Sequence, residues 1–283
     1  MPDKRVISWE QAIEWFKAQP DKQELVRAGY YDEPLIGAAQ RFIESQEWKA
    51  ICKLLRAWMP GRVIELGAGH GIGSYAFARA GCTVVATEPD PSPIVGAKAI
   101  QCLARETNLS IQVVRSIGEK LAFDASYFDI VYAREALHHA RDLKELCQEA
   151  ARVLRPGGVF LATREHVISR SKDLPTFLQS HSLHHLYGGE NAFLLREYLN
   201  ALHGAGLAVM HVYGPYDSPI NALPMTRTQN RARIAAKLQK YVGGAAANWL
   251  SKEDDLWFLM GHIRSWIDNT PGRLYSFLSV KSA

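Results

Sequence analysis

A glycine-rich segment is the part of the sequence whose residue types point most clearly to a ligand site. It reads VIELGAGHGIG and runs from Val63 to Gly73, with an apolar stretch before the glycines. Glycine adopts backbone conformations closed to other residues and lets a ligand approach the main chain closely. Glu65 precedes the glycines, and Glu88 ends the next strand-like stretch. A carboxylate at that second position can accept both hydroxyl hydrogens of a ribose, so the pattern predicts a ribose-containing cofactor.

Four later residues at the ends of strand-like stretches are candidates for a catalytic role. They are His138, His139, Glu165 and His166. Histidine and glutamate are common general bases, and a base is needed where an acceptor must lose a proton. Capping or hydrogen bonding of a neighbouring loop is the alternative role for each of them.

A histidine cluster at His181, His184 and His185, with Glu190 nearby, has the short spacing found in some zinc sites. HxxHH in a loop is not a specific signature, so no metal is predicted. Because the adjoining Tyr187-Gly188-Gly189 combines an aromatic ring with flexible glycines, we interpret this segment as a lid that faces the acceptor.

The middle of the chain alternates strand-like and helix-like segments, which is typical of a parallel sheet covered by helices. The predicted strands cover residues 63–66, 83–87, 111–115, 128–133, 159–163, 207–213 and 274–280. The predicted helices cover residues 73–80, 91–106, 142–154 and 191–203. The third of these helices is the clearest, because its apolar residues recur every 3.6 positions and Asp142 can cap its start.

Three stretches interrupt this alternation, and we expect them to gather over the edge of the sheet where ligands bind in open α/β folds. The expected parts are an N-terminal helical extension (1–60), a cofactor-binding core (61–213) with a lid insertion (166–190), a helical insertion (214–272) and a final strand (273–283). Trp257 and Trp266, in a predicted helix of the insertion, are expected in its core.

Further motifs follow the glycines in a fixed order. They are GEKLAF from Gly118, FDIVY from Phe128, LHH from Leu137 and VLRPGG from Val153. With the glycine segment and Glu88, this order resembles the class I methyltransferases, specifically the broad group called methyltransferase type 11, over roughly residues 60–165. The resemblance implies an α/β, Rossmann-like fold with a seven-stranded, mostly parallel sheet whose last strand is antiparallel. It also implies helices on both faces, helical additions over the cofactor and substrate edge, and S-adenosylmethionine as the cofactor.

The resemblance further implies which residues hold this cofactor. Those expected around its methionine part are Glu65, Gly67, Ala68, Gly69 and Gly71. Glu88 would hold the ribose, with Pro89 beside the adenine, and Arg134 would lie between cofactor and acceptor. The adenine edge would be lined by Ile117, Gly118 and Glu119. Many relatives carry an aspartate where Ile117 stands, so backbone groups or the Glu119 carboxylate would take over its role here.

Composition and charge indicate which kinds of partner the chain is expected to lack. The chain has 283 residues, 47% of them hydrophobic and 22% charged, and its net charge of +4 is mild. Its basic residues are scattered, which argues against a nucleic-acid partner; the densest group, Arg227, Arg231 and Arg233, is interpreted as an exposed helix face. The cysteines (Cys52, Cys82, Cys102 and Cys147) form no CxxC pair and predict reduced thiols. Neither a signal-peptide core nor a membrane span is evident, so a cytoplasmic protein without a membrane partner is expected.

These observations predict an S-adenosylmethionine-dependent methyltransferase that acts on a small-molecule acceptor, such as a sugar or another hydroxyl compound. A protein side chain is the other acceptor considered. Two alternatives stay open. The first is an NAD-dependent oxidoreductase, against which the motifs after Glu88 argue. The second is a catalytically inactive methyltransferase-like protein that binds a partner, against which the intact glycines and Glu88 argue.

Overall fold

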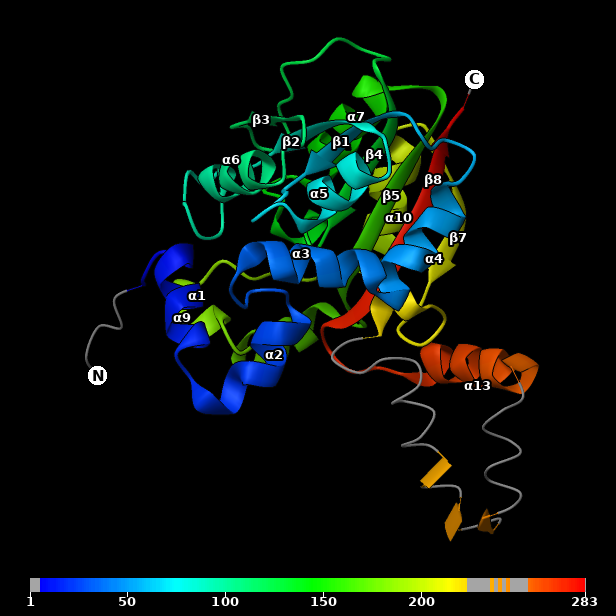
Figure 1. Cartoon of the computed structure of the whole chain (residues 1–283). Coiled ribbons are helices and arrows are strands. Elements are labelled where there is room, and N and C mark those ends of the chain that lie inside the picture. Colours follow the sequence, from blue (N-terminus) through cyan, green and yellow to red (C-terminus); the bar gives the residue numbers. More distant parts are fainter. Residues whose placement is uncertain (1–5, 223–234, 237–238, 241–242, 245–253, 283) are drawn as a thin grey trace.

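The computed structural model describes residues 6–222, 235–236, 239–240, 243–244 and 254–282. For residues 254–260 it describes the backbone without the side chains. The predicted basic group Arg227, Arg231 and Arg233 and most of the predicted helical insertion lie outside these residues. The described elements form one twisted sheet with helices on both of its faces (Figure 1).

Eight strands form the sheet. They are β1 (Arg62–Leu66), β2 (Thr83–Thr87), β3 (Ile111–Val114), β4 (Phe128–Arg134), β5 (Leu154–Ile168), β6 (Phe193–Leu194), β7 (Leu207–Tyr213) and β8 (Arg273–Lys281). Their order is β3-β2-β1-β4-β5-β8-β7, and β6 pairs with β5. Strands β1 to β5 run parallel to one another, whereas β8 is antiparallel to both β5 and β7. The predicted fold class is confirmed.

Two details of the sheet differ from the sequence prediction. β5 is longer than expected, because its residues beyond Thr163 pair with the start of β8, where Glu165 lies opposite Tyr275. The last residues of β5 also pair with the short strand β6, which interrupts the start of the helix predicted over residues 191–203. The extended end of β5 carries Glu165 and His166 beyond the edge formed by the shorter strands.

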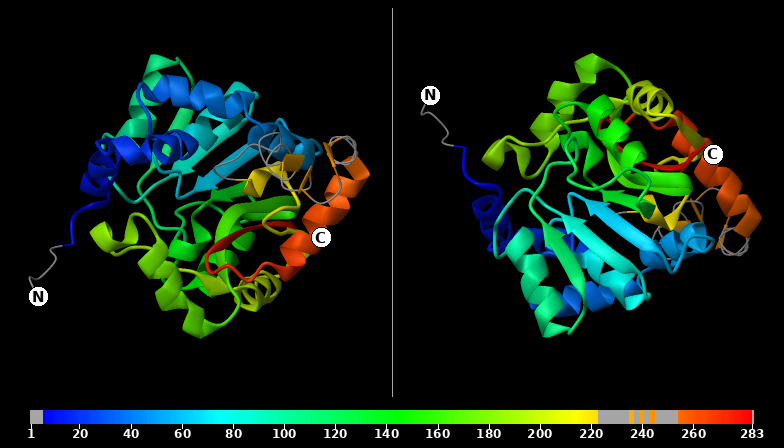
Figure 2. Two further views of the ribbon diagram at one scale, coloured as in Figure 1. Left: turned by 90° about the horizontal axis from the view of Figure 1, so that it is seen from below. Right: turned by 90° about the horizontal axis from the view of Figure 1, so that it is seen from above.

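The helices of the core are α3 (Leu35–Glu44), α4 (Gln46–Leu55), α5 (Ile72–Arg79), α6 (Ala97–Glu106), α7 (Leu143–Val153) and α10 (Leu195–Gly204). Helices α7 and α10 pack on one face of the sheet, and α4, α5 and α6 pack on the other (Figure 2). Asp142 caps α7 as predicted, since its carboxylate accepts the backbone N–H groups of Lys144 and Glu145 at 2.9 and 3.1 Å. Helix α6 begins later than predicted because Asp90 and Ser92 form a capped turn before it.

Short elements connect and cover this core. They are α1 (Trp9–Lys17), η1 (Pro20–Lys22), α2 (Gln23–Ala28), η2 (Leu137–His139), η3 (Ser171–Asp173), α8 (Leu174–Ser180), α9 (His184–Tyr187), η4 (Pro219–Asn221) and α13 (Asp254–Ile267). Helices α1 and α9 are far apart in sequence but lie side by side (Figure 1). The Ile7 N–H donates to the Leu186 carbonyl at 3.1 Å, and the rings of Trp9 and Tyr187 are 4.6 Å apart. The N-terminal extension and the segment after β5 therefore form a joint cover.

Helix α13 corrects one expectation about the aromatic residues. Trp266 is 89% exposed, so placing it in a core was wrong. The helix instead turns Ser265 inward, whose hydroxyl accepts the Tyr216 N–H at 2.9 Å. The side chain of Trp257 lies outside the described part of the structure. Among the described residues, no helix combines the length and the apolar character that a bilayer crossing requires.

Candidate active site

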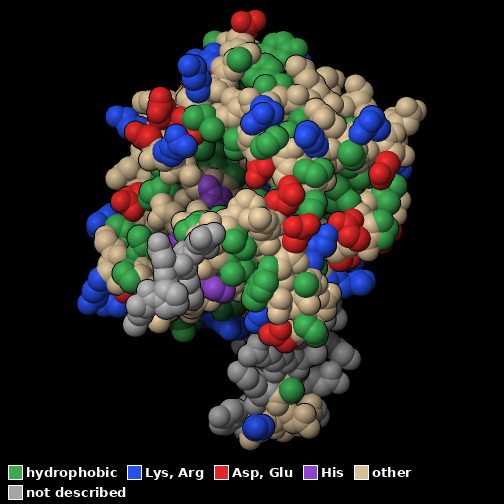
Figure 3. All heavy atoms as spheres, turned by 90° about the vertical axis from the view of Figure 1, so that its left-hand side faces the viewer, with side chains coloured by type: hydrophobic (Ala, Val, Ile, Leu, Met, Phe, Trp, Pro, Cys, Tyr) green, Lys and Arg blue, Asp and Glu red, His purple; other side chains and the backbone are tan. Residues whose placement is uncertain are grey.

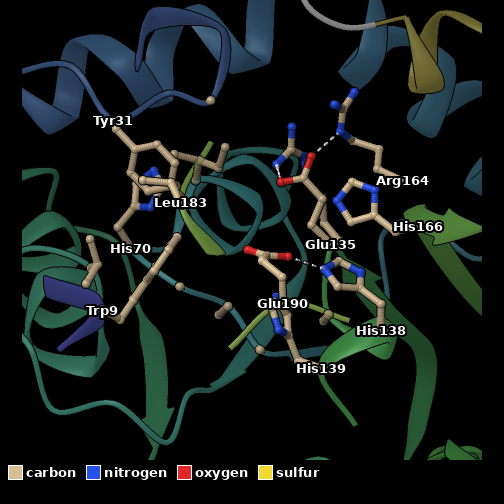
Figure 4. Close-up of a pocket in the computed structure, with 18 of the residues that line it drawn as sticks. Trp9, Tyr31, His70, Glu135, His138, His139, Arg164, His166, Leu183 and Glu190 are labelled. Atoms are coloured by element: carbon tan, nitrogen blue, oxygen red, sulfur yellow. Dashed lines mark hydrogen bonds and ion pairs between the residues drawn. The ribbon is translucent and has the colours of Figure 1, made fainter. Parts of the chain in front are cut away.

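A cavity of about 560 Å³ lies at the carboxyl ends of β1, β2, β4 and β5. The glycine turn after β1, the residues that follow β4 and the last part of β5 form its floor, while α1, α2 and residues 181–190 cover it (Figure 4). Histidine side chains are visible beside a hollow on this face of the molecule (Figure 3). The expectation that ligands bind outside the carboxyl ends of the strands agrees with this position of the cavity.

The glycine turn gives the cavity an open backbone surface. Gly67, Gly69 and Gly71 have φ values of 62°, 56° and 90°, in the left-handed region that favours glycine. A Cβ atom at Gly69 would meet no described atom within 4 Å, so this backbone faces open space. At Gly73 a Cβ atom would lie 2.2 Å from Glu65 Oε1, so that glycine makes room for the carboxylate beneath α5.

Two buried carboxylates flank the turn. Glu65 accepts a hydrogen bond from the Ser74 hydroxyl, and burial raises the pKa of Glu65 to about 7. Glu88 accepts the N–H groups of Gly69 at 2.8 Å and Asp90 at 2.9 Å. Glu88 is only 7% exposed, and burial raises its pKa also to about 7. Each Glu88 oxygen keeps a lone pair that can accept a hydroxyl, which is the chemistry that a ribose requires.

Most residues predicted to hold a cofactor line this cavity. They are Glu65, Gly67, Ala68, Gly69, Glu88, Pro89 and Arg134. The open Gly69 backbone beside the Glu88 carboxylate fits a nucleoside cofactor. Gly71 lies behind the turn, where a Cβ atom would be 3.1 Å from the side chain of Ile100.

The three residues predicted for the adenine edge lie outside the cavity lining. Ile117 is 41% exposed, and a Cβ atom at Gly118 would press on Leu146 at 2.8 Å. The Glu119 carboxylate accepts the Arg141 N–H at 2.8 Å, which holds the loop before α7. Their contact with the cofactor stays a prediction.

A buried ion-pair network lies beside the glycine turn. Arg134 donates to Glu47 at 2.8 Å and to Glu135 at 3.3 Å, and Arg164 donates to Glu135 at 2.5 Å. Burial alone would raise the pKa of Glu135, but Arg134 and Arg164 outweigh burial and hold that pKa well below its usual range. The network joins α4 to the ends of two neighbouring strands.

Arg134 is the one member of this network that was predicted from the sequence as a site residue. Its partners Glu47, Glu135 and Arg164 were not predicted. A signal was present, because an Arg-Glu pair follows strand β4 at 134–135 and recurs near the end of strand β5 at 164–165. Paired Arg and Glu at the ends of two adjacent parallel strands indicate a shared network. Glu47 comes from the N-terminal extension, and its partner could not be read from spacing.

His138 and Glu165 form a buried pair. His138 is 1% exposed, and its Nδ1 lies 2.8 Å from Glu165 Oε2. Glu165 also accepts the N–H groups of Ala136 at 3.1 Å and of His138 at 3.0 Å. Burial lowers the pKa of His138 to about 3 and raises that of Glu165 to about 7. Glu165 lies outside the cavity lining, and its contacts orient η2 and the His138 ring.

The other two predicted catalytic histidines also line the cavity. Nδ1 of His139 lies 2.9 Å from the Gly189 carbonyl, and Nδ1 of His166 lies 2.7 Å from the Gly272 carbonyl. Burial lowers the pKa of His166 to about 4, so its imidazole is neutral near pH 7. Because a carbonyl only accepts hydrogen bonds, Nδ1 of each ring carries the hydrogen and Nε2 keeps its lone pair.

The predicted histidine cluster after β5 is divided in the structure. His181 and Glu190 line the cavity, whereas His184 and His185 lie outside its lining. Glu190 accepts a hydrogen bond from the Tyr187 hydroxyl. Tyr31 and His70, which sequence analysis did not single out, complete the wall, with ring centroids 4.9 Å apart.

Solved structures define the class of fold to which this arrangement belongs. A putative sarcosine dimethylglycine methyltransferase from Galdieria sulphuraria aligns over 96% of this chain and 98% of its own, at 18% identity and a TM-score of 0.59. Geranyl diphosphate C-methyltransferase from Streptomyces coelicolor, solved with S-adenosyl-L-homocysteine, aligns over 82% and 76%, at 16% identity and a TM-score of 0.56. The cyclase SpnF has a TM-score of 0.55 at 18% identity over 87% and 81%. These likenesses show the Rossmann-like methyltransferase fold.

Sequence comparison places the core more closely. Residues 64–162 match a family model described as "Methyltransferase domain". A ubiquinone biosynthesis O-methyltransferase from Methylobacterium nodulans is 28% identical over 162 residues, which cover 56% of this chain and 64% of the relative. Its counterpart from Hahella chejuensis is 35% identical over 111 residues, covering 38% and 45%. The chain thus matches less than two thirds of the length of these relatives. Residues 64–162 form a class I methyltransferase domain, and the cofactor of that class is S-adenosylmethionine.

Proposed function

We propose that this chain is an S-adenosylmethionine-dependent methyltransferase that transfers the methyl group to an oxygen of a small molecule. The observation that carries the proposal is the open Gly69 backbone beside the buried Glu88 carboxylate, within a covered cavity. The relatives named as O-methyltransferases support oxygen as the acceptor atom. The acceptor hydroxyl would belong to a sugar or another small metabolite.

The cavity supports a small acceptor because its volume is limited and shared with the cofactor. Trp9 and Leu183 come from separate segments and cover it together with Tyr31 (Figure 4). Such a cover excludes water and holds two reactants in one orientation, which is the protein's main task in a displacement reaction. A protein side chain as acceptor would require α1 and the segment 181–190 to move aside.

The residues on the cofactor side have distinct tasks. When bound, S-adenosylmethionine supplies an electrophilic methyl group on a positively charged sulfur. The Glu88 carboxylate would accept the ribose hydroxyls, and the glycine turn would leave room for the cofactor chain. Arg134, which pairs with Glu135 in the wall of the cavity, would lie between the cofactor and the acceptor.

The acceptor side is lined by His138, His139 and His166. The Nε2 atoms of these rings can accept a hydrogen bond, and a hydroxyl acceptor must lose its proton during methyl transfer. The rings of His138 and His166 are 4.7 Å apart, so these two histidines lie at the same end of the cavity. This end is therefore the proposed position of the acceptor hydroxyl.

Calorimetric titration with S-adenosylmethionine and S-adenosylhomocysteine tests the cofactor part of the proposal. We expect binding to the wild-type protein, and in Glu88→Ala a loss of about tenfold or more, which is about 1.4 kcal/mol. Glu106→Ala removes an exposed carboxylate at the end of α6 and serves as the matched control. A folded wild-type protein that binds neither compound would overturn the proposal and favour the inactive, partner-binding alternative.

A screen with methyl-labelled cofactor tests the acceptor part. Fractionated small metabolites and intact proteins are offered separately to the wild-type protein. Label is expected in a hydroxyl-bearing small molecule. Label found only in intact protein would contradict the small-molecule assignment and leave the cofactor assignment untouched.

A further inference from the structure

An unpaired carboxylate oxygen belongs to Glu190, which lines the cavity. Glu190 is 9% exposed, and its Oε1 accepts the Tyr187 hydroxyl. Its Oε2 is buried and has no hydrogen-bond partner among the described residues. The nearest basic atom, Nε2 of His138, lies 3.7 Å away, which is too long for a hydrogen bond (Figure 4). Buried polar atoms are nearly always satisfied, so this oxygen is available to a bound group such as an ion or a water.

Two histidines direct free nitrogen lone pairs to the same place. His138 uses Nδ1 toward the Glu165 carboxylate, and His139 uses Nδ1 toward the Gly189 carbonyl. Each ring therefore presents Nε2 as its available atom. Metal-binding histidines almost always donate their other ring N–H to a carboxylate or carbonyl in this way, which fixes the ring and its tautomer. The groups that fix the two rings come from other parts of the chain, Glu165 from β5 and Gly189 from the segment that follows α9.

The three groups are also close enough to share one ion. One ligand atom from each of His138, His139 and Glu190 lies within 4.8 Å of the other two. Nitrogen and oxygen ligands bind zinc at about 2.0–2.2 Å, so ligand atoms on one ion are about 3–4 Å apart. The observed 3.7 Å between His138 Nε2 and Glu190 Oε2 has this spacing.

We propose that His138, His139 and Glu190 bind one divalent first-row transition-metal ion in the cavity. Two imidazoles and one carboxylate suit ions of the zinc and ferrous type, and three protein ligands leave further positions open. Because these residues line the cavity together with His166, the ion would take the Nε2 lone pairs of His138 and His139 and leave His166 to accept a hydrogen bond from the acceptor hydroxyl. Binding of the ion does not depend on the proposed methyltransferase activity. Its use to hold an acceptor oxygen and lower the pKa of that hydroxyl does rest on it.

A second set of three groups shares Glu190 and is the competing assignment. One ligand atom from each of His166, His181 and Glu190 also lies within 4.8 Å of the others. However, the carboxylate oxygen that faces His181 Nδ1 at 3.8 Å is Oε1, which already accepts the Tyr187 hydroxyl. The Leu183 N–H also donates to His181 Nδ1 at 3.4 Å and occupies its lone pair. The unpaired Oε2 belongs with His138, so the first set is favoured.

Cobalt(II) titration of the full-length protein tests the site, because cobalt has visible absorption bands that report nitrogen and oxygen ligands. The protein is first stripped with a chelator, and zinc affinity is then measured by displacement of cobalt. We expect one cobalt ion per chain in the wild type and about a tenfold or greater loss of affinity in Glu190→Gln, comparable with known losses at metal sites. His139→Ala should show the same loss with the fold intact, because the His139 side chain is exposed.

Two further variants sharpen the result. His203→Ala, at an exposed position of α10, is the matched control and should bind cobalt as the wild type does. His181→Ala should change the affinity by less than about threefold, since it belongs to the competing set. Absence of cobalt binding in the wild type overturns the proposal, and so does a large loss in His181→Ala with none in His139→Ala. Binding of S-adenosylhomocysteine by the metal-free protein, measured in parallel, separates a failed metal site from a failed cofactor site.

Discussion

Glu88 is a buried carboxylate whose protonation should control cofactor affinity near neutral pH. Its pKa in the free protein is raised to about 7 by burial, and only the ionised form accepts both ribose hydroxyls. Below pH 7 the free protein holds a proton that binding must remove, so affinity should fall as the pH falls. Between pH 8 and pH 6 the ionised fraction drops from about nine tenths to about one tenth, which predicts about tenfold weaker binding. Calorimetry with S-adenosylhomocysteine between pH 6 and pH 8 measures this change in affinity.

Glu88→Gln is the control for this pH dependence, because an amide does not titrate. Its affinity should be low and constant between pH 6 and pH 8. If the variant kept the wild-type slope, the titrating group would be another one, such as Glu65, whose pKa is also raised to about 7. Glu65 lies beneath the turn and bonds the Ser74 hydroxyl, so Glu65→Gln separates the two carboxylates.

Glu119 should act on stability and leave cofactor affinity unchanged. Its carboxylate accepts the Arg141 N–H at 2.8 Å and lies outside the cavity lining. Glu119→Ala removes that capping contact, and we expect a loss of about 1 kcal/mol in the free energy of unfolding. Urea unfolding measures the loss of stability, and calorimetry on the same preparation measures the cofactor affinity. Cofactor binding that weakened about tenfold would instead support Glu119 at the adenine edge.

At the residue scale, spacing predicts a group well when its role depends on its position in a strand or turn. Glu88 and the glycines could be read from the sequence because they follow strand ends directly. Glu190 was noted only for its closeness in sequence to His181, and its approach to His138 could not be read, because the chain crosses α8 and α9 between them. The same holds for Glu47, which meets Arg134 across 87 residues of sequence.

The turn between β1 and α5 offers a contrast between two glycines. Gly69→Ala adds a methyl group in open space but in a left-handed conformation, which costs about 1–2 kcal/mol. Because that methyl group would occupy the space proposed for the cofactor, binding should be lost more than stability. Gly73→Ala presses a methyl group against the Glu65 carboxylate, so it should destabilise the fold by about 1–3 kcal/mol. Thermal unfolding and cofactor calorimetry on both variants distinguish them, and equal effects on binding would contradict this assignment.

Helix α4 is tied to the strand ends by a buried charge. Glu47 accepts from Arg134 at 2.8 Å and lies 3.9 Å from Arg164, and all three side chains are buried. Glu47→Gln leaves two buried guanidinium groups with Glu135 as their remaining carboxylate in this network, so we expect a loss of about 3 kcal/mol in unfolding free energy. Urea unfolding measures it. Glu44→Gln, at an exposed position of α3, should change stability by less than about 0.5 kcal/mol.

The periodic elements of the core could be predicted from the sequence, and the elements fixed by distant pairing could not. Helix α7 begins and ends within one residue of its predicted bounds, because its apolar spacing and its Asp142 cap are local signals. Strand β6 has only two residues, and they form a strand because they pair with Val167 and Ile168. No local pattern marks it, and the predicted helix over 191–203 included it for that reason.

At the scale of the whole molecule, the order of the strands brings together side chains that lie far apart in the sequence. The order β2-β1-β4-β5 places the turns after these strands along one edge, so the glycines, Arg134 and the histidines share one cavity. The resemblance to a known fold predicted a mostly parallel sheet with an antiparallel last strand, and the structure adds the order of its strands. A cover over this edge was expected, but the contact between α1 and α9 was not, since it joins two segments whose own sequences give no sign of each other.

The cover should behave as one unit, because its two halves hold each other. Trp9 of α1 contacts Tyr187 of α9 with ring centroids 4.6 Å apart, and the Ile7 N–H bonds the Leu186 carbonyl. Trp9→Ala removes the contact between the Trp9 and Tyr187 rings, so both segments should exchange their amide hydrogens faster. Hydrogen exchange followed by mass spectrometry should show about tenfold faster exchange in peptides covering 9–17 and 184–187, equivalent to about 1.4 kcal/mol, with α7 unchanged. Glu14→Ala, at an exposed position of the same helix, is the control. Faster exchange in α1 alone would mean that the two halves open independently, and the cavity would then have two separate entrances instead of one joint cover.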